Sequence, residues 1–275
     1  MNIALCFTVR NCGKYLPDIF KNIELVKTLN VNVFCIFIYD NCSDNSASLL
    51  IEYKNKNKNV IVKMIENTSL RRVTRIAKAR NVCLDILYNT LEDISFHMMI
   101  DSDDKGASEW NIDTIDKYLH NFDNDDWDCI SFNRKGFYDI WALLYEDIKH
   151  HCWGYESQSQ KVVDYMRNDI TKKLSNLDDH TLFTCLSAFN GFGIYKTPLF
   201  KNIAYDGEYK NIKTFISDKD INDSVEHLKK HNILDSDTAS STFAGFGEEH
   251  CEHLFYHLSA IKEKNARIRI SKFIL

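Results

Sequence analysis

Apolar runs and helix-spaced apolar positions alternate through the first hundred residues. Four short runs are almost continuously apolar: Ile3–Val9, Val33–Tyr39, Val60–Ile65 and Phe96–Ile100. Three segments between them carry apolar residues at helical spacing: Tyr15–Leu29, Ser46–Tyr53 and Arg75–Tyr88. Continuously apolar strands are typical of a parallel sheet that is buried on both faces. This alternation predicts an α/β fold with a mostly parallel central sheet and helices on both faces.

The second half of the chain has a less regular pattern. We predict helices over Ile112–His120 and Lys161–Leu174, and a strand over Trp127–Asn133. A further helix is expected within Phe243–Glu263, after a glycine-containing turn. The chain has only 9 Gly and 2 Pro, so long flexible linkers are absent. This composition favours one compact domain.

Composition and charge exclude several classes of protein. With 275 residues and 44% hydrophobic content, the chain can bury a sizeable core. The formal net charge of −5 argues against nonspecific nucleic-acid binding, which needs a dense basic face. No stretch approaches the roughly 18–20 apolar residues of a membrane helix, and the N-terminus lacks the basic region of a signal peptide. The nine scattered cysteines form no C-x-x-C pair, which suits a reducing compartment and gives a zinc knuckle little support.

Polar turns follow three of the predicted strands. They begin after Val9, Tyr39 and Ile100. In open α/β sheets, ligands bind beyond the carboxyl ends of the strands. We therefore expect these three turns to line one crevice.

The turn after the fourth apolar run reads Asp101-Ser102-Asp103. Two carboxylates two residues apart can approach one hard cation, because Mg²⁺ and Mn²⁺ prefer oxygen ligands. A diphosphate would supply further oxygens, and the metal would neutralise charge that develops on a leaving group. A solvated acidic turn has the same sequence, but the position at the end of a buried strand favours a metal site.

The turn after the second apolar run, residues 40–46, is also rich in polar side chains. Asp40 stands at the end of the strand, where its carboxylate can bond the edge of a base or a ribose. The same segment is typical of a turn in which Ser43 or Asp44 caps the next helix. Both interpretations can hold, with Asp40 on a ligand and Asp44 on the cap.

A basic segment leads into the third predicted helix. Arg75 and Arg80 can each bond a diphosphate or a carboxylate in bidentate fashion. The other basic side chains of this segment fit a solvated helix surface: Arg71, Arg72 and Lys78.

Acidic and imidazole side chains crowd the segment from Gly245 to Phe255. If a helix begins near Glu248, Glu249 and His253 are four residues apart and share a face, which offers a carboxylate base and an imidazole ligand. An ordinary amphipathic helix with acidic residues at its start has the same pattern, and without other signals we favour it. His-Glu-x-x-His does not occur, so a zincin site is not supported.

Taken in order, these segments resemble GT-A glycosyltransferases, most of all compact enzymes of the capsular mannosyltransferase type and their relatives in large DNA viruses. The matching pieces cover most of the chain: Thr8-Val9-Arg10-Asn11, Tyr39-Asp40-Asn41-x-Ser43-x-Asn45-Ser46, Arg75-Ile76-Ala77-x-Ala79-Arg80-Asn81, Asp101-x-Asp103, Phe189-Asn190-Gly191-Phe192-Gly193-Ile194-Tyr195-Lys196 and Cys251-Glu252-His253.

The resemblance implies a binding site for a nucleotide-diphosphate sugar. Thr8, Arg10 and Asp40 would hold the nucleoside. Arg75 and Arg80 would stand near the diphosphate.

The resemblance also implies a Mn²⁺ or Mg²⁺ cofactor and a catalytic segment. Asp101 would contact ribose or metal, and Asp103 would ligate the metal directly. The late metal ligand would be His253, with His250 as the less favoured alternative. An enzyme that inverts the anomeric centre would take its base from one of two carboxylates, Glu249 or Glu252.

On this basis we expect a GT-A-like, Rossmann-like single domain over residues 1–275. Residues 1–104 would bind the nucleotide-sugar, and residues 105–275 would bind the acceptor and complete catalysis. The activity would be hexosyl or pentosyl transfer to a hydroxyl of a glycan or glycoprotein acceptor. No nucleic-acid partner and no membrane span are expected, and the location would be cytoplasmic, in the host cytoplasm if the protein is viral.

Other classes of protein share some of these features. A nucleotidyltransferase has the same layered fold and also holds a metal ion with carboxylates. The phosphate loop of such enzymes needs several glycines, however, and the turn at Thr8–Gly13 has only one. An inactive carbohydrate-binding module could dispense with Asp103 and the late acidic cluster. A cysteine-dependent hydrolase lacks a convincing Cys–His pair, because Cys251 and His250 are neighbours that would point to different helix faces. The sequence leaves open the donor, the acceptor, the stereochemistry and the oligomeric state.

Overall fold

The computed structural model describes residues 1–121, 125–134, 136–235 and 249–275. The chain forms two compact units that interleave in sequence. The first unit comprises residues 1–125, 191–205 and 275, and the second comprises residues 126–190 and 206–274.

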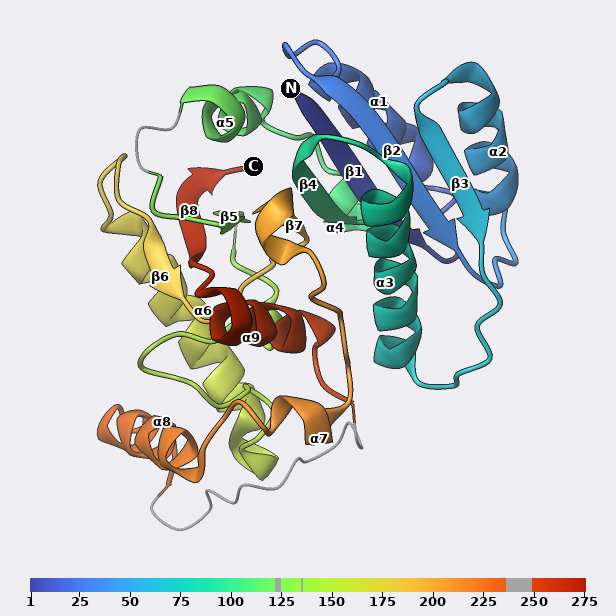
Figure 1. The fold of residues 1–275 in the computed structure, drawn as a ribbon. Helices are drawn as coiled ribbons and strands as arrows, with labels where there is room; N and C mark the ends of the chain where they lie inside the picture. The colour runs from blue at the N-terminus through green and yellow to red at the C-terminus, as the bar shows by residue number, and fades with distance from the viewer. Residues whose placement is uncertain (122–124, 135, 236–248) are drawn as a thin grey trace. The chain divides into compact units, whose positions relative to one another are not determined.

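Five of the eight strands of the sheet form the centre of the first unit (Figure 1). Its strands, in spatial order, are β3 (Val60–Met64), β2 (Asn32–Tyr39), β1 (Asn2–Val9), β4 (Ile94–Asp101) and β7 (Phe192–Lys196). The first four are parallel, and β7 runs antiparallel to β4. The four strands predicted from the apolar runs are therefore confirmed, and so is their parallel arrangement.

The helices of the first unit connect these strands. They are α1 (Leu16–Val26), α2 (Ser46–Lys56), α3 (Arg72–Thr90), α4 (Asp104–Ala107) and α5 (Ile112–Asp116), with a π-helical turn η1 (Lys117–Asn121) and a 3₁₀ turn η4 (Thr197–Phe200). Because β2 and β3 lie on one side of β1 and β4 lies on the other, right-handed crossovers require α1 and α2 on one face and α3 on the opposite face. Figure 1 shows this arrangement, which confirms helices on both faces.

Aromatic side chains fasten α1 and α2 to the sheet. Phe20 of α1 stacks on Tyr53 of α2 with ring centroids 4.0 Å apart, and its ring meets Phe37 of β2 edge-on at 6.0 Å. Phe37 stacks in turn on Phe7 of β1 at 4.6 Å. Burial of such rings contributes a large share of core stability, with about 0.5–1.5 kcal/mol per pair beyond the area buried.

The second unit has three strands and several helices. Its strands are β5 (Cys129–Asn133), β8 (Ile268–Ile274) and β6 (Phe183–Cys185), with β8 parallel to β5 and antiparallel to β6. Its helical segments are η2 (Ile140–Ala142), η3 (Glu156–Gln158), α6 (Ser159–Ser175), α7 (Tyr209–Ile212), α8 (Asp218–Lys230) and α9 (Glu252–Lys264). The sequence pattern predicted β5 and α6, but it did not predict α8 or β8.

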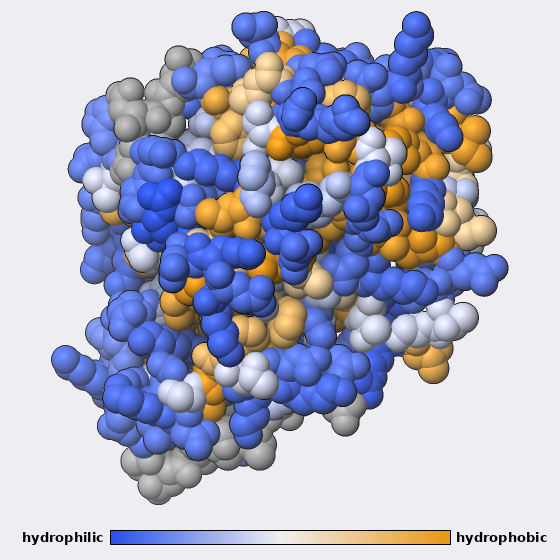
Figure 2. All heavy atoms as spheres, in the orientation of Figure 1, coloured by the Kyte–Doolittle hydropathy of each residue, from blue (hydrophilic) through white to orange (hydrophobic). Residues whose placement is uncertain are grey.

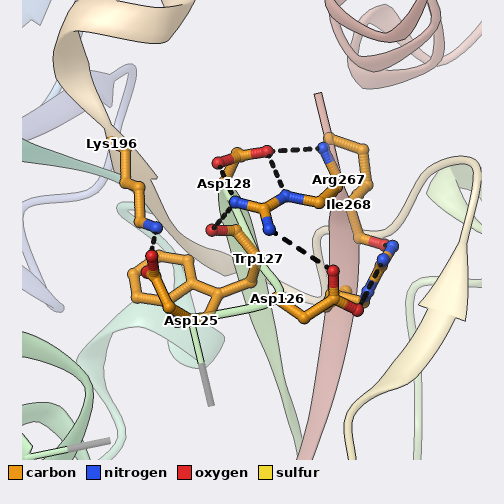
Figure 3. A network of polar contacts seen from close by, with 8 residues as sticks. Asp125, Asp126, Trp127, Asp128, Lys196, Arg267 and Ile268 are labelled. Carbon is orange, nitrogen blue, oxygen red and sulfur yellow. Dashed lines mark hydrogen bonds and ion pairs between the residues drawn. The ribbon is translucent and has the colours of Figure 1, made fainter. Parts of the chain in front are cut away.

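An ion-pair network joins the start of β5 to the start of β8 (Figure 3). Arg267 donates to both carboxylate oxygens of Asp128, from Nε and from Nη2, at 2.8 Å each. Arg269 reaches Asp126 at 2.9 Å, and Arg267 also reaches Asp126 at 3.4 Å. Asp128 is 5% exposed, whereas the side chain of Arg267 is 39% exposed, so the carboxylate of this bidentate pair is withdrawn from water and the guanidinium only in part.

Hydrophilic side chains cover most of the face shown in Figure 2, with apolar atoms visible between them.

Within the part of the chain that is described, no helix combines the length and apolarity needed to cross a bilayer. All nine cysteines are free thiols, seven of them buried.

Candidate functional site

A pocket of about 270 Å³ lies at the carboxyl ends of β1, β2 and β4, beside α3. The three polar turns predicted to line one crevice all contribute to it, which confirms that expectation. All the residues predicted to bind the nucleotide-sugar line this pocket, together with the second acidic residue of the turn after β4: Thr8, Arg10, Asp40, Arg75, Arg80, Asp101 and Asp103.

Asp40 places a buried carboxylate on the wall of this pocket. The residue is 6% exposed. Its Oδ2 atom lies 3.8 Å from Nη1 of Arg10, and this oxygen accepts no hydrogen bond from any of the described residues. A buried acceptor without a partner is costly, so a ligand N–H or O–H at this position would be favoured.

The turns after β1 and β2 are tied together by side chains that also shape the pocket. Asn11, in the left-handed conformation with φ 53°, accepts a 2.7 Å hydrogen bond from the backbone N–H of Ser43. Asp44 accepts from the N–H groups of Gly13 and Ser46, at 2.8 and 3.0 Å. Partial loss of hydration raises the pKa of Asp44, but a 2.6 Å hydrogen bond from the Ser46 hydroxyl and these two backbone bonds outweigh it and hold the pKa below its ordinary value. The prediction that Ser43 or Asp44 caps α2 is wrong, because the N-cap is Asn45 and its side chain makes no capping bond. Asp44 instead joins the first residue of α2 to the turn after β1.

Arg80 makes a contact that the sequence did not reveal. It is 3% exposed, and its Nη2 donates to Oδ1 of Asp101 at 3.0 Å. Its guanidinium carbon lies 5.5 Å from the ring centroid of Tyr205. The side chain of Asn81 holds Tyr205 by bonding both its backbone N–H, at 2.8 Å, and its carbonyl, at 2.9 Å. Tyr205 belongs to no motif and lies 125 residues from Arg80, so no local signal could have found it.

Arg75 and Lys78 organise the segment that precedes α3. Nη1 of Arg75 donates to the carbonyls of Ser69 and Leu70, at 2.9 Å each. Nζ of Lys78 donates to the carbonyl of Glu66 at 2.7 Å. Arg72, which the sequence assigned to the helix surface, is exposed and also lines the pocket.

The acidic turn after β4 is fixed by the short helix that follows it. Oδ1 of Asp103 accepts a hydrogen bond from the N–H of Lys105 at 2.9 Å, which caps α4. A Cβ atom on Gly106 would lie 1.6 Å from the carbonyl oxygen of Asp101, so only glycine permits this approach. Nε1 of Trp110 donates to the carbonyl of Gly106 at 2.9 Å and completes the support.

The donor set at this turn suits a divalent metal that is shared with a ligand. Asp101 and Asp103 both line the pocket and offer carboxylate oxygens, the ligand type that Mn²⁺ and Mg²⁺ prefer. No group of three or more His, Cys, Asp or Glu side chains able to hold a metal occurs among the residues the structure describes. A phosphate-bearing ligand would therefore have to complete the coordination.

The late acidic and imidazole segment differs from its predicted form. Helix α9 begins at Glu252 rather than near Glu248, and Glu249 forms a β-bridge with Glu208. Glu249 is thus not on the helix and does not share a helical face with His253. The first part of the predicted helix, Phe243–Glu248, lies outside the described residues.

His253, in the second unit, is 1% exposed and stacks on Phe189, with ring centroids 3.7 Å apart. Glu252 is 6% exposed in the first turn of α9. Burial lowers the pKa of His250 to about 3, so this imidazole is neutral at physiological pH. The large rings of Trp110, Trp127 and Phe137 are core side chains, exposed by 3% or less.

No family model matches the chain, and no curated protein matches its sequence. S. aureus TarS 1–349 in complex with UDP has 17% sequence identity and a TM-score of 0.49. That alignment covers 99% of this chain and 58% of TarS 1–349, so the chain spans less than two thirds of this structure.

Two further solved structures are more distant. The mannosyltransferase PcManGT from Pyrobaculum calidifontis, in complex with GDP-Man and Mn²⁺, has 11% identity and a TM-score of 0.47, with 94% of this chain and 69% of that chain covered. Glucosyl-3-phosphoglycerate synthase from Mycobacterium tuberculosis has 8% identity and a TM-score of 0.39, with 72% and 57% covered. At TM-scores below 0.5, these similarities carry no functional argument.

Proposed function

We propose that this protein is a metal-dependent glycosyltransferase, which moves a sugar from a nucleotide-diphosphate sugar to a hydroxyl of a glycan or glycoprotein acceptor. The observation that supports this most is the composition of the pocket in the first unit. It combines a buried hydrogen-bond acceptor and a pair of carboxylates at the carboxyl ends of three parallel strands with several arginines, most of them on α3.

Each part of the pocket matches one part of such a donor. The buried carboxylate of Asp40 would accept an N–H of the base, and Thr8 and Arg10 would complete the nucleoside site. Arg72 and Arg75 would contact the diphosphate, because guanidinium groups bind phosphate oxygens in bidentate fashion. Arg80 would act through Asp101 rather than on the diphosphate, since it is buried against that carboxylate.

Asp103, with Asp101, would hold the Mn²⁺ or Mg²⁺ ion. When bound, the ion would neutralise the negative charge that develops on the nucleoside diphosphate as the glycosidic bond breaks. Gly106 and Trp110 keep the backbone of this turn in place. The chain itself would thus supply an already oriented pair of carboxylates, which is the condition for electrostatic stabilisation of a leaving group.

Three roles in the second unit are proposed from the motif resemblance alone. Glu249 or Glu252 would take the proton of the acceptor hydroxyl in an inverting reaction, and His253 would be the late metal ligand. Single Gln variants of the two glutamates separate the roles. Only the base variant should abolish transfer while leaving nucleotide binding intact.

Nucleotide release from UDP-, GDP- and CMP-sugars, measured with and without Mn²⁺ in a mixture of candidate glycans, tests the proposal. We expect release from one donor class, dependent on metal and stimulated by one acceptor. Asp103→Ala should abolish the metal-dependent release without changing the melting temperature by more than a few degrees. Release of pyrophosphate from a nucleoside triphosphate in place of this activity would favour a nucleotidyltransferase.

A further inference from the structure

The second unit contains a pocket of about 400 Å³ that shares no residue with the pocket of the first unit. We propose that it binds an amphipathic anion, that is, a carboxylate or phosphate carried on an alkyl or isoprenoid chain. This proposal does not depend on the glycosyltransferase assignment. Pockets of this size are typical of sites that enclose small ligands.

The lining of this pocket is mostly apolar. Six side chains form the apolar surface: Leu144, Leu186, Phe215, Ile216, Leu258 and Ile261. Leu144 and Leu258 are buried, whereas the other four are half-buried. The methylene groups of a ligand would remove this surface from water, which is the main source of affinity for an apolar chain.

Phe215 gives the pocket a fixed wall. Its ring meets that of Phe255 edge-on, with centroids 5.5 Å apart, which orients it without a ligand. Leu258, Ile261 and Lys262 come from the same helix, α9. A wall that is already ordered lowers the entropy lost when a ligand binds.

The charges around the pocket favour a negative head group. Lys149 lies 3.0 Å from Glu146 and 3.7 Å from Asp220, the one acidic side chain of the lining, so this lysine is already shared between two carboxylates. Nζ of Lys262 lies 5.1 Å from the ring centroid of Phe215 and pairs with no carboxylate in the described chain. The lining therefore combines an apolar surface with one cation that a ligand anion would neutralise.

Titration calorimetry with straight-chain carboxylates, from hexanoate to dodecanoate below their micellar concentrations, tests the proposal. Each added methylene group should raise the affinity by up to about fourfold, the equivalent of ~0.8 kcal/mol, until the pocket is filled. Alkylamines of the same length should bind more weakly. Absence of binding, or an affinity that does not depend on chain length, would overturn the proposal.

A pair of matched variants locates the head group. Lys262→Glu should weaken carboxylate binding by roughly tenfold or more and favour the alkylamines, because it reverses the local charge. Lys264→Glu changes the same charge on the same helix outside the lining, so it should leave binding unchanged. Equal effects of the two variants would mean a nonspecific charge effect and contradict the site. Ile216→Asp, checked for an unchanged melting temperature, should abolish binding of every chain length.

Discussion

Nη2 of Arg80 lies 3.0 Å from Oδ1 of Asp101, and this ion pair connects the middle of α3 to the last residue of β4. The guanidinium side chain is 4% exposed and the carboxylate is 27% exposed, so water screens the pair only in part. Asp101 is one of the two acidic residues on which the proposed metal site depends. Arg80 thereby sets the orientation of that carboxylate before any ligand arrives.

Loss of the Arg80 side chain should affect both stability and ligand binding. Arg80→Gln removes the charged partner of Asp101 and should lower the free energy of unfolding by about 1.5–3 kcal/mol, the range for hydrogen bonds to charged groups. Arg80→Lys retains the charge and should lose less. Denaturant unfolding of both variants, combined with Asp101→Asn in a double-mutant cycle, measures the coupling. Additive effects of the two substitutions would contradict a direct interaction.

Gly106→Ala should disturb the acidic turn through steric contact alone. The new Cβ would meet the carbonyl oxygen of Asp101 at 1.6 Å, so the backbone of the turn must move. We expect weaker metal-dependent nucleotide binding, although no charge is altered. Ala107→Gly changes the same short helix by one methyl group without approaching Asp101, and calorimetry should find its binding close to that of the unaltered protein.

The fold of the first unit could be predicted well because its signals are local. Each apolar run is long enough to define a strand, and the strand–helix alternation predicts parallel strands, whose carboxyl ends share one edge where the polar turns meet. The contact made by Arg80 could not be predicted in this way. Its basic side chain fits a phosphate site in the sequence, but its partner depends on how closely α3 packs beside β4, which no local pattern encodes.

The second unit was harder to predict because its signals are weak or nonlocal. Helix α8 has only three buried apolar side chains, Ile221, Val225 and Leu228. Strand β8 contains Arg269, a charged residue that is only 9% exposed and pairs with Asp126, 143 residues earlier in the chain. The start of α9 could not be read from the local pattern, because Glu249 pairs with a distant residue, Glu208.

His97 should make stability depend on pH. It is fully buried on β4, stacks on Tyr195 and bonds Thr197, and burial lowers its pKa to about 3. The unfolded chain binds a proton near pH 6.5, so the free energy of unfolding is highest above that pH and falls as the pH drops toward 3. For His97 alone the loss between pH 7.5 and pH 5 is about 2 kcal/mol.

The contribution of His97 can be isolated by comparison with His97→Phe, which keeps an aromatic ring but cannot titrate. Urea unfolding at several pH values should give a smaller decrease for the variant, and the difference should grow only below about pH 6.5. Parallel curves for the two proteins would contradict a buried neutral imidazole.

The two carboxylates that pair with Arg267 differ in burial, so the same substitution, Asp to Asn, tests how burial changes the contribution of an ion pair to stability. Asp128→Asn removes a bidentate, largely buried partner and should cost about 1.5–3 kcal/mol of stability. Asp126→Asn removes a carboxylate whose side chain is 54% exposed, and it should cost no more than about 1 kcal/mol. Chemical denaturation ranks the two, and the reverse order would contradict the network shown in Figure 3.

The most direct test of the proposed function is a thermal-shift screen of UDP-, GDP- and CMP-sugars, with and without Mn²⁺, on the unaltered protein and on Asp103→Ala. A ligand that binds only the folded state raises the melting temperature. We predict a rise that requires one nucleotide-sugar together with the metal, and that Asp103→Ala loses. No shift with any nucleotide-sugar on folded protein, or the same shift in Asp103→Ala, would contradict a metal-dependent donor site in this pocket.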